Sequence, residues 1–262
     1  MDNRLPHPPL QEVIFELKWR LDSIQPGFLK DPHYQILIGT LYGKLRELGY
    51  SFHEPLQTSN IPDEMVPYIV QHRFRPSKEQ WPLVQIGSGI LTLNDTTHYS
   101  WPDFSKRIRD LVENFFYVYP ELDSLQILEM NLRYIDAVTI PEGTDPKEYL
   151  KQSVGADIVM PEALFINTGV MNRPVGFDIY QTFPQEGDGT LVMIRYIYGH
   201  GTPPGKFTWE TTVHIDGETV PKTPEKIIQW CNQAHDLTHD WFLKMCSDER
   251  QCSLFSYRRI IN

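Results

Sequence analysis

Residues 12–20, EVIFELKWR, decide how the rest of the chain is expected to fold. Apolar and charged side chains alternate along this stretch, and a period of two is typical of a strand with one buried face. The apolar row consists of Val13, Phe15, Leu17 and Trp19, and the charged row of Glu12, Glu16, Lys18 and Arg20. A similar stretch, LEMNLRYID, recurs at residues 128–136. We therefore predict two related strands, each of which leads one half of the chain.

The first half is expected to contain two amphipathic helices separated by three strands. Asp31 and Pro32 predict the start of one helix, with aspartate as the N-cap and proline as the first helical residue. Gly49 predicts the end of that helix. Ser100 followed by Asp103 resembles a capping box and predicts the start of the second helix. The elements expected between the helices are a loop over 51–65 and strands over 68–75, 83–87 and 90–94.

The second half repeats this plan after Pro120. Asp145 and Pro146 predict the start of a short helix, and Thr223 and Pro224 predict the start of a long one. The strands expected in this half cover 128–140, 176–183, 191–198 and 207–215. Consecutive strands joined by short turns favour antiparallel pairing. The predicted fold class is therefore α+β, with antiparallel sheets and helices packed on one face.

The two halves are interpreted as a duplicated strand–helix–three-strand–helix unit. The units cover residues 1–122 and 123–262, and the short connection between them favours one compact body. The apolar row of the first strand is matched with Leu128, Met130, Leu132 and Tyr134. The alternative is that any two amphipathic strands look alike at this length. The sequence leaves open whether the halves share one continuous sheet or form separate lobes.

Composition and charge restrict the classes of function. The chain has 262 residues, 40% of them apolar, which suits a soluble globular protein with a sizeable core. It has no run of about 20 apolar residues that would span a membrane, and its first residues lack the pattern of a secretion signal. A cytoplasmic location is expected. A net charge of −10 argues against strong non-specific binding of nucleic acid. Cys231, Cys246 and Cys252 form no disulfide framework, which fits a reducing compartment.

Histidines and one cysteine are the weak candidates for metal binding or catalysis. Cys231, His235 and His239 are spaced four residues apart on the expected last helix, and thiolate with imidazole suits zinc. The alternative is a core cysteine beside two histidines on the flank of the helix. His200 lies in a Gly- and Pro-rich stretch that predicts either a mobile catalytic loop or an ordinary hairpin loop. No assembled catalytic motif is present, so we predict no cofactor and no catalytic residue.

Charged residues at alternate positions of the expected strands are the candidate binding residues. A polar sheet face of this kind can grip an anionic ligand, a peptide or a strand of nucleic acid. The alternative is cross-strand salt bridging on a solvated face, with acidic partners such as Glu16, Asp178 and Glu210. The candidates for ligand or partner binding are Lys18, Arg73, Arg75, Arg133, Arg195 and Glu129.

The last ten residues, SLFSYRRIIN at 253–262, carry apolar side chains beyond the long helix. They are expected either to fold back on the core of their own chain or to add a strand to a sheet edge, in the same or another subunit.

Several stretches together resemble a sporadically distributed family of uncharacterised bacterial proteins. These stretches are PPL at 8–10 with EVIFEL at 12–17, VQIG at 84–87, LTLN at 91–94 running into Tyr99 and Trp101, LRYI at 132–135, and the late helix with His235 and Phe242. Asp136 departs from the pattern, since asparagine is expected there. The resemblance implies a stand-alone bacterial protein from variable regions of the genome, where mobile elements and phage-defence genes gather. It implies no catalytic residue.

The leading functional hypothesis is a non-enzymatic binding or regulatory component of a bacterial phage-defence or mobile-element system. It would recognise a protein or ligand on a sheet face. The expected partner is another protein or a second copy of the chain, with no membrane partner. One alternative is a hydrolase or nuclease that works in a groove between the halves and uses His200 or the His235–His239 pair. Another is local binding of nucleic acid through the strand arginines.

Overall fold

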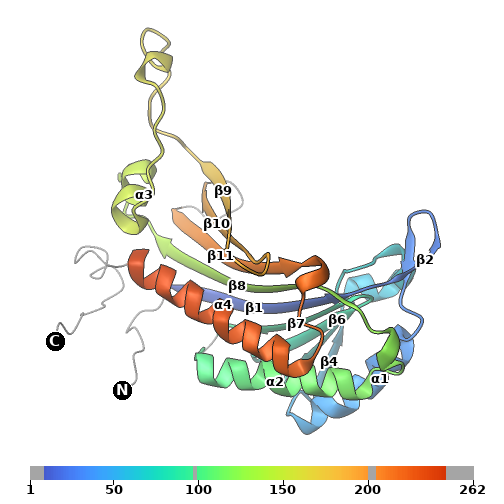
Figure 1. Ribbon diagram of the computed structural model, residues 1–262. Coiled ribbons are helices and arrows are strands. Elements are labelled where there is room, and N and C mark those ends of the chain that lie inside the picture. Colours follow the sequence, from blue (N-terminus) through green and yellow to red (C-terminus); the bar gives the residue numbers. More distant parts are fainter. Residues whose placement is uncertain (1–8, 97–98, 200–204, 246–262) are drawn as a thin grey trace, which may run out of the picture.

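The computed structural model describes residues 9–96, 99–199 and 205–245, and within them one antiparallel sheet dominates. The sheet has nine strands in the order β4-β5-β6-β7-β1-β8-β11-β10-β9, and β2 and β3 form a separate hairpin. In Figure 1 the helices lie along one side of this sheet, and the other side is open. The predicted α+β class, with antiparallel strands and helices on one face, is confirmed.

The elements have the following bounds. The strands are β1 Leu10–Trp19, β2 Asp22–Gln25, β3 Phe28–Lys30, β4 Phe52–Pro55, β5 His72–Arg75, β6 Leu83–Gly87, β7 Ile90–Asp95, β8 Ile127–Thr139, β9 Phe177–Pro184, β10 Leu191–Tyr198 and β11 Lys206–Asp216. The helices are α1 Tyr34–Glu47, α2 Trp101–Val118, α3 Pro146–Val154 and α4 Pro224–Met245. Short 3-10 turns are η1 Gln57–Asn60, η2 Asp63–Met65, η3 Leu122–Ser124, η4 Glu162–Leu164 and η5 Gly217–Thr219.

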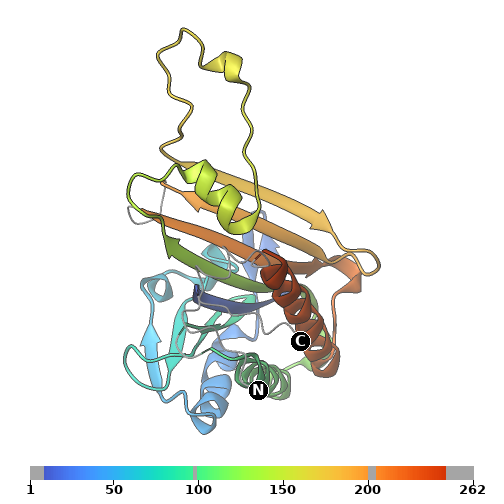
Figure 2. The same cartoon turned by 90° about the vertical axis from the view of Figure 1, so that its left-hand side faces the viewer.

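The two halves share one continuous sheet, which settles the alternative that the sequence left open. Strands β5-β6-β7-β1 of the first half are ordered like β9-β10-β11-β8 of the second, and β1 pairs antiparallel with β8 where the halves meet. Helices α2 and α4, which end the two halves, pack side by side beneath the sheet (Figure 2). The shared strand order agrees with the interpretation of a repeated unit.

The core lies between the sheet and the helices. Val13, Phe15, Leu17 and Trp19 of β1 are completely buried, as the alternation in the sequence predicts. Burial of a side chain of this size contributes about 1.5–3 kcal/mol, so each member of the row contributes measurably to stability. The helix residues that cover this row include Leu37, Leu41 and Leu45 of α1 and Phe104, Ile108, Leu111, Val112 and Phe115 of α2.

The starts of α1 and α2 differ from the predicted caps. Helix α1 begins at Tyr34 with His33 as its N-cap, not at Asp31 and Pro32. The carboxylate of Asp31 accepts from the indole of Trp19 and from the backbone N–H of His33, so it holds the turn that precedes the helix and not the first helical residue. Ser100 is the N-cap of α2 but makes no side-chain capping bond. The cap of α3 is as predicted, with Asp145 accepting from the backbone N–H of Lys147.

The strands of the first half differ from the prediction in three places. The expected loop over 51–65 contains β4, whose pattern of polar residues and a terminal proline hides its strand character. The expected strand over 68–75 forms only from His72, because Tyr68 has a φ of 60° and so leaves the extended conformation. Residues 22–30 form the β2–β3 hairpin, which the sequence patterns did not predict.

The antiparallel pairing of β1 with β8 has register shifts at both ends, and the one at Lys18 and Trp19 affects a residue that was matched with the apolar row of β1. Lys18 faces Glu129, but Trp19 faces Ile127, so Leu128 has no partner in β1. Leu128 is therefore exposed. Ile127 is buried in the place that the sequence match assigned to Leu128. Met130, Leu132 and Tyr134 are buried as expected.

A long arm over residues 155–176 leaves the body between α3 and β9 and carries η4 near its tip (Figures 1 and 2). No element was predicted there. His200, Cys246, Cys252 and the tail over 253–262 lie outside the described residues. Across the parts of the chain that are described, no helix combines the length and the apolar content needed to cross a membrane.

Candidate functional site

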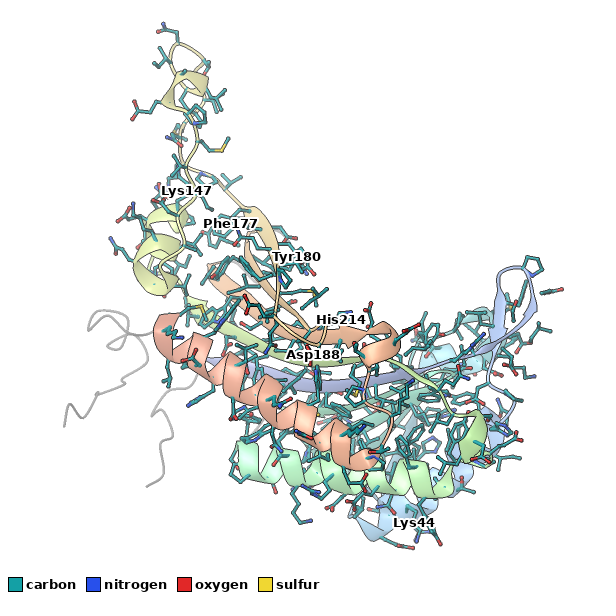
Figure 3. The ribbon with its side chains drawn as sticks, in the orientation of Figure 1. Lys44, Lys147, Phe177, Tyr180, Asp188 and His214 are labelled. Carbon is teal, nitrogen blue, oxygen red and sulfur yellow. The ribbon has the colours of Figure 1, made fainter. Side chains whose placement is uncertain are left out.

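The open face of the sheet carries a groove of about 890 Å³ over β1, β8, β11, β10 and β9. Residues of these strands reach it because side chains alternate between the two faces of a sheet, so each strand contributes every second residue. The register aligns Glu16, Asn131 and His214 in one row across β1, β8 and β11. Figure 3 shows His214 and Tyr180 on the side of the sheet opposite the long helices. The groove thus extends from the centre of the sheet to its β9 edge, and most of its lining side chains are polar or charged.

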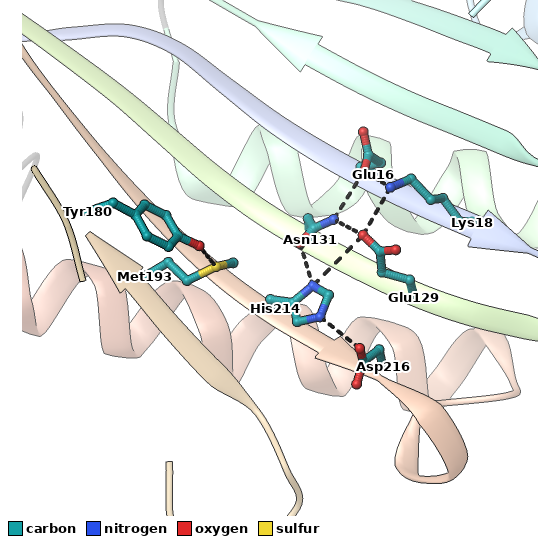
Figure 4. Close-up of polar contacts among 8 residues, drawn as sticks. All are labelled: Glu16, Lys18, Glu129, Asn131, Tyr180, Met193, His214 and Asp216. Atoms are coloured by element: carbon teal, nitrogen blue, oxygen red, sulfur yellow. Dashed lines mark hydrogen bonds and ion pairs between the residues drawn. The ribbon is translucent and has the colours of Figure 1, made fainter. Parts of the chain in front are cut away.

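The first network in the groove is centred on Lys18. Its ammonium group lies 3.2 Å from Oε1 of Glu16 and 3.0 Å from Oε1 of Glu129 (Figure 4). Burial alone would lower the pKa of Lys18, but the two carboxylates outweigh burial, and the pKa is raised. Burial would raise the pKa of Glu129, but the hydrogen bonds from Lys18 and Asn131 lower it. Lys18 and Glu129 therefore hold each other in their charged forms.

Asn131 and His214 extend this network across β8 and β11. The amide nitrogen of Asn131 donates to Glu16 at 3.0 Å and to Glu129 at 2.8 Å. Its oxygen consequently faces Nδ1 of His214 at 2.9 Å, so Nδ1 carries the proton and donates. Nε2 of His214 lies 3.3 Å from a carboxylate oxygen of Asp216. From Lys18 to Nδ1 of His214, each donor in this row thus meets an acceptor.

A second network neutralises the other end of the groove. The guanidinium of Arg195 donates to both carboxylate oxygens of Asp178, at 2.8 and 2.6 Å, and lies 4.0 Å from Glu210. The hydrogen bonds from Arg195 lower the pKa of Asp178. Arg195 and Asp178 are exposed, so this bidentate pair orders the surface more than it stabilises the fold.

Arg133 stands apart from both networks. It lies on β8 between Ile14 of β1 and Thr212 of β11. Within the described chain its guanidinium makes no hydrogen bond and no ion pair, although its neighbours in the groove include four carboxylates. Each of these carboxylates already faces Lys18 or Arg195. The groove therefore presents one free planar cation, a group suited to a bidentate bond with a carboxylate or phosphate.

Of the predicted binding residues, Lys18, Glu129, Arg133 and Arg195 meet in this groove, and Arg73 and Arg75 do not. The latter two lie on β5, beyond β6 and β7, and both contact Glu54 of β4. Arg75 also donates to the backbone carbonyl of Gln80 at 3.1 Å. Lys18, Arg73, Arg75 and Arg195 thus form cross-strand salt bridges, as the alternative interpretation of the sequence expected. Arg133 is the exception.

Sequence reasoning missed the uncharged members of the groove. Asn131, Thr212 and His214 complete the rows, and Tyr180 contacts the sulfur of Met193 on the same face. Their signal was present in the sequence, because Glu129, Asn131 and Arg133 are spaced by two, as are Glu210, Thr212 and His214. The order of the strands in the sheet decides which of these alternating residues become neighbours, and the strand order was not predicted.

The candidate metal ligands Cys231, His235 and His239 belong to α4, on the helix side of the sheet and away from the groove. Cys231 is buried in the core. His235 stacks on Trp101 with ring centroids 4.1 Å apart, and its Nδ1 lies 2.9 Å from the hydroxyl of Tyr134. Burial, with a smaller contribution from His239, lowers the pKa of His235 to about 4. Among the described residues, no three His, Cys, Asp or Glu side chains are grouped so that they could hold a metal ion.

Asp136 is a buried acid on the same helix side of β8. Burial raises its pKa from 3.8 to about 7. No hydrogen bond to its carboxyl group is found in the described chain. The resemblance noted above expects asparagine at this position, and an amide would be neutral at every pH.

We expect the Asp136→Asn substitution to stabilise the protein at alkaline pH and to change little near pH 4. A raised pKa means that the favourable contribution of Asp136 is complete below about pH 4 and is lost as the pH rises through about 7. At pH 8 the variant should gain on the order of 2–4 kcal/mol in the free energy of unfolding, measured by urea denaturation. Asp123→Asn, at an exposed position, is the control. An equal effect of Asp136→Asn at both pH values would contradict this prediction.

Comparison with known proteins identifies no relative from which a function could be transferred. No model of a known protein family matches the sequence, and a search of curated proteins finds no match. The resemblance to a sporadic bacterial family stays a prediction. The groove is therefore the feature of the molecule from which a function can be inferred.

Proposed function

We propose that the protein is a binding component whose open sheet face recognises a segment of a partner protein, and that Arg133 pairs with a carboxylate of that segment. The observation that carries the proposal is the unpaired guanidinium of Arg133 in a groove whose other charges face one another. Because Arg133 is not engaged in an ion pair within the chain, a carboxylate of a partner can form a salt bridge with it without breaking an existing one.

The charges in the groove favour a carboxylate over a phosphate. Three cations line it, against four carboxylates, so the lining is slightly acidic overall. Nucleic acid and other polyphosphates need several free cations to replace their counterions, and among the described residues of the groove only Arg133 is free. A peptide brings one acidic side chain together with backbone donors and acceptors. Thr212, opposite Arg133 on β11, adds a hydroxyl group to the groove lining.

The wider role proposed here is regulatory. The motifs shared with the sporadic bacterial family support a role in a phage-defence or mobile-element system, where recognition proteins work beside separate enzymes. The partner in this proposal is a protein encoded with the chain in the same bacterium, and its acidic segment lies across β8 and β11.

Selection of random peptides on the immobilised full-length protein tests the proposal. We expect the enriched peptides to share one aspartate or glutamate at a fixed position, because a single cation in a fixed place selects a single acid. Arg133→Glu should abolish the enrichment. Arg133→Lys should retain it with affinity weaker by roughly tenfold, since lysine keeps the charge but loses the planar fork.

The matched control is Lys226→Glu, which makes the same change of charge on the exposed face of α4, on the helix side. It should leave the selected peptides and their affinities unchanged. Enriched peptides without an acidic residue, or equal binding by the Arg133→Glu variant, would show that Arg133 is not the recognition group. A selection that enriches no peptide would count against a peptide partner.

A further inference from the structure

Exposed apolar side chains are concentrated on one side of the molecule, on the arm and on β9. Of the large hydrophobic residues exposed in the described chain, the majority lie between residues 159 and 183. A soluble monomer rarely gathers exposed apolar residues in one region unless that region contacts a partner. The residues concerned are Val159, Met160, Leu164, Ile166, Val170, Met171, Val175, Tyr180 and Phe183.

Strand β9 is an edge strand with a free row of backbone groups. It is hydrogen-bonded to β10 and to no other strand of the sheet. Its register continues past the strand, where the N–H of Gln185 donates to the carbonyl of Thr190 at 2.8 Å. Hydrogen-bonded and non-bonded pairs alternate along antiparallel strands, so the odd-numbered residues of β9 bond to β10. The N–H groups of Asp178, Tyr180 and Thr182 therefore point outward from the sheet.

This edge has few of the features that prevent pairing between sheets. Protected edges usually carry free charges, prolines or bulges. The one charged side chain of β9, Asp178, is held by Arg195 within the chain. The one proline, Pro184, is the last residue of the strand, and β9 pairs with β10 without a register shift. An unprotected edge of eight residues is long enough for stable strand pairing.

We propose that β9 pairs antiparallel with β9 of a second copy of the chain, around a two-fold axis at Tyr180. Only residues with outward N–H groups can face each other as hydrogen-bonded pairs. Centred on Tyr180, the pairing sets Tyr180 against its own equivalent and Asp178 against Thr182, and it uses every outward N–H of the strand. Centred one residue later, it would set Asp178 against Pro184, which has no N–H to donate.

The side chains agree with this register. On the helix side, Phe177 comes opposite Phe183 of the second copy, so apolar groups meet apolar groups. On the groove side, Asp178 comes opposite a threonine, and no like charges are brought together. Figure 3 shows Phe177 and Tyr180 along the outermost strand of the sheet. The arm and β9 together offer about 30 residues, which matches the 20–30 residues per side of a standard interface.

The pairing joins the two grooves into one surface. Asp178, Tyr180 and Thr182 line the groove at the edge where the second copy docks. The dimer would therefore present two Arg133 side chains, related by the two-fold axis, on one continuous open face. This inference rests on the strand edge and stands whether or not the groove binds a peptide.

Sedimentation velocity of the full-length protein tests the dimer. We expect wild type to be dimeric at micromolar concentration, and both Tyr180→Lys and Tyr180→Asp to be monomeric, because each places like charges on the axis. An equimolar mixture of the two variants should form a heterodimer, since the charges then attract. Thr182→Pro removes one outward N–H but none that bonds to β10, and it should also weaken the dimer.

Controls separate loss of pairing from loss of folding. Tyr117→Lys and Tyr117→Asp change an exposed tyrosine of α2, on the helix side, and should remain dimeric. Circular dichroism should show each Tyr180 variant folded. A monomeric wild type at 100 μM, dimeric Tyr180→Lys and Tyr180→Asp variants, or folded variants that fail to form the heterodimer would each overturn the proposal.

Discussion

The Gly87→Ala substitution is expected to destabilise the protein by on the order of 3 kcal/mol or more, the largest effect that we predict for a single methyl group. A Cβ atom at Gly87 would lie 1.9 Å from the carbonyl oxygen of Ile69 and 2.7 Å from its carbonyl carbon. Both atoms belong to the backbone, so no side chain can rotate away to make room.

The backbone that faces Gly87 cannot retreat without breaking other contacts. On either side of Ile69, the N–H of Tyr68 donates to the carbonyl of Ser88 at 2.8 Å, and that of Gln71 donates to Ile86 at 2.9 Å. These two bonds tie the segment to β6 and to the turn that follows it. Adding a methyl group must therefore separate the segment from the strand or distort the β6–β7 hairpin.

Urea denaturation of Gly87→Ala beside Gly43→Ala measures this effect. Gly43 lies in the middle of α1 with nothing within 4 Å of the added Cβ, so its replacement should be neutral or stabilise by about 0.5–1 kcal/mol. A Gly87→Ala variant as stable as wild type would show that the segment at Ile69 is free to move.

The Asp31→Ala substitution is expected to cost about 3–5 kcal/mol in the free energy of unfolding. Asp31 is buried, and its carboxylate accepts from the indole N–H of Trp19 at 2.8 Å and the backbone N–H of His33 at 2.8 Å. It also accepts from the hydroxyl of Tyr119 at 3.3 Å. Alanine leaves these donors without an acceptor inside the core, at the junction of β1, α1 and α2.

The Asp31→Asn substitution keeps the volume of the side chain and changes its hydrogen bonds, so it measures the contribution of the hydrogen bonds alone. Asparagine keeps one acceptor oxygen but turns an amide donor toward one of the donors, so a smaller loss than that of alanine is expected. Asp123→Ala, at an exposed position, is the control and should change stability by less than about 0.5 kcal/mol. A loss below about 1 kcal/mol for Asp31→Ala would mean that water replaces the carboxylate.

The sequence predicts most of the fold because the long elements have clean periodicity. The alternation in β1 and the helical spacing of Phe104, Ile108 and Phe115 depend only on local pattern, and these elements form as expected. β4 was missed because four residues, two of them polar and one a proline, carry too little pattern. The arm was missed because its apolar residues are broken by glycine and proline without a period.

Alternation in the sequence indicates the charged residues of the groove, but neither its uncharged residues nor the pairing between its charges. Alternation places Lys18, Arg133 and Arg195 on the open face without any knowledge of the fold. Which cation is free depends on strand order, because Lys18 meets Glu129 only through the β1–β8 pair, 111 residues away in sequence. The bulge at Leu128 is likewise invisible in the alternation, since it arises from the pairing of two strands.

A charge-exchange measurement of peptide affinity tests the role of Arg133 most directly. The dissociation constant of a selected acidic peptide is measured by calorimetry for wild type and for Arg133→Glu, and then for a peptide in which the shared acid is replaced by lysine. We expect Arg133→Glu to weaken the acidic peptide by about 100-fold, or about 2.7 kcal/mol, and the lysine peptide to restore most of that loss. Equal affinity of the acidic peptide for both proteins would contradict recognition through Arg133.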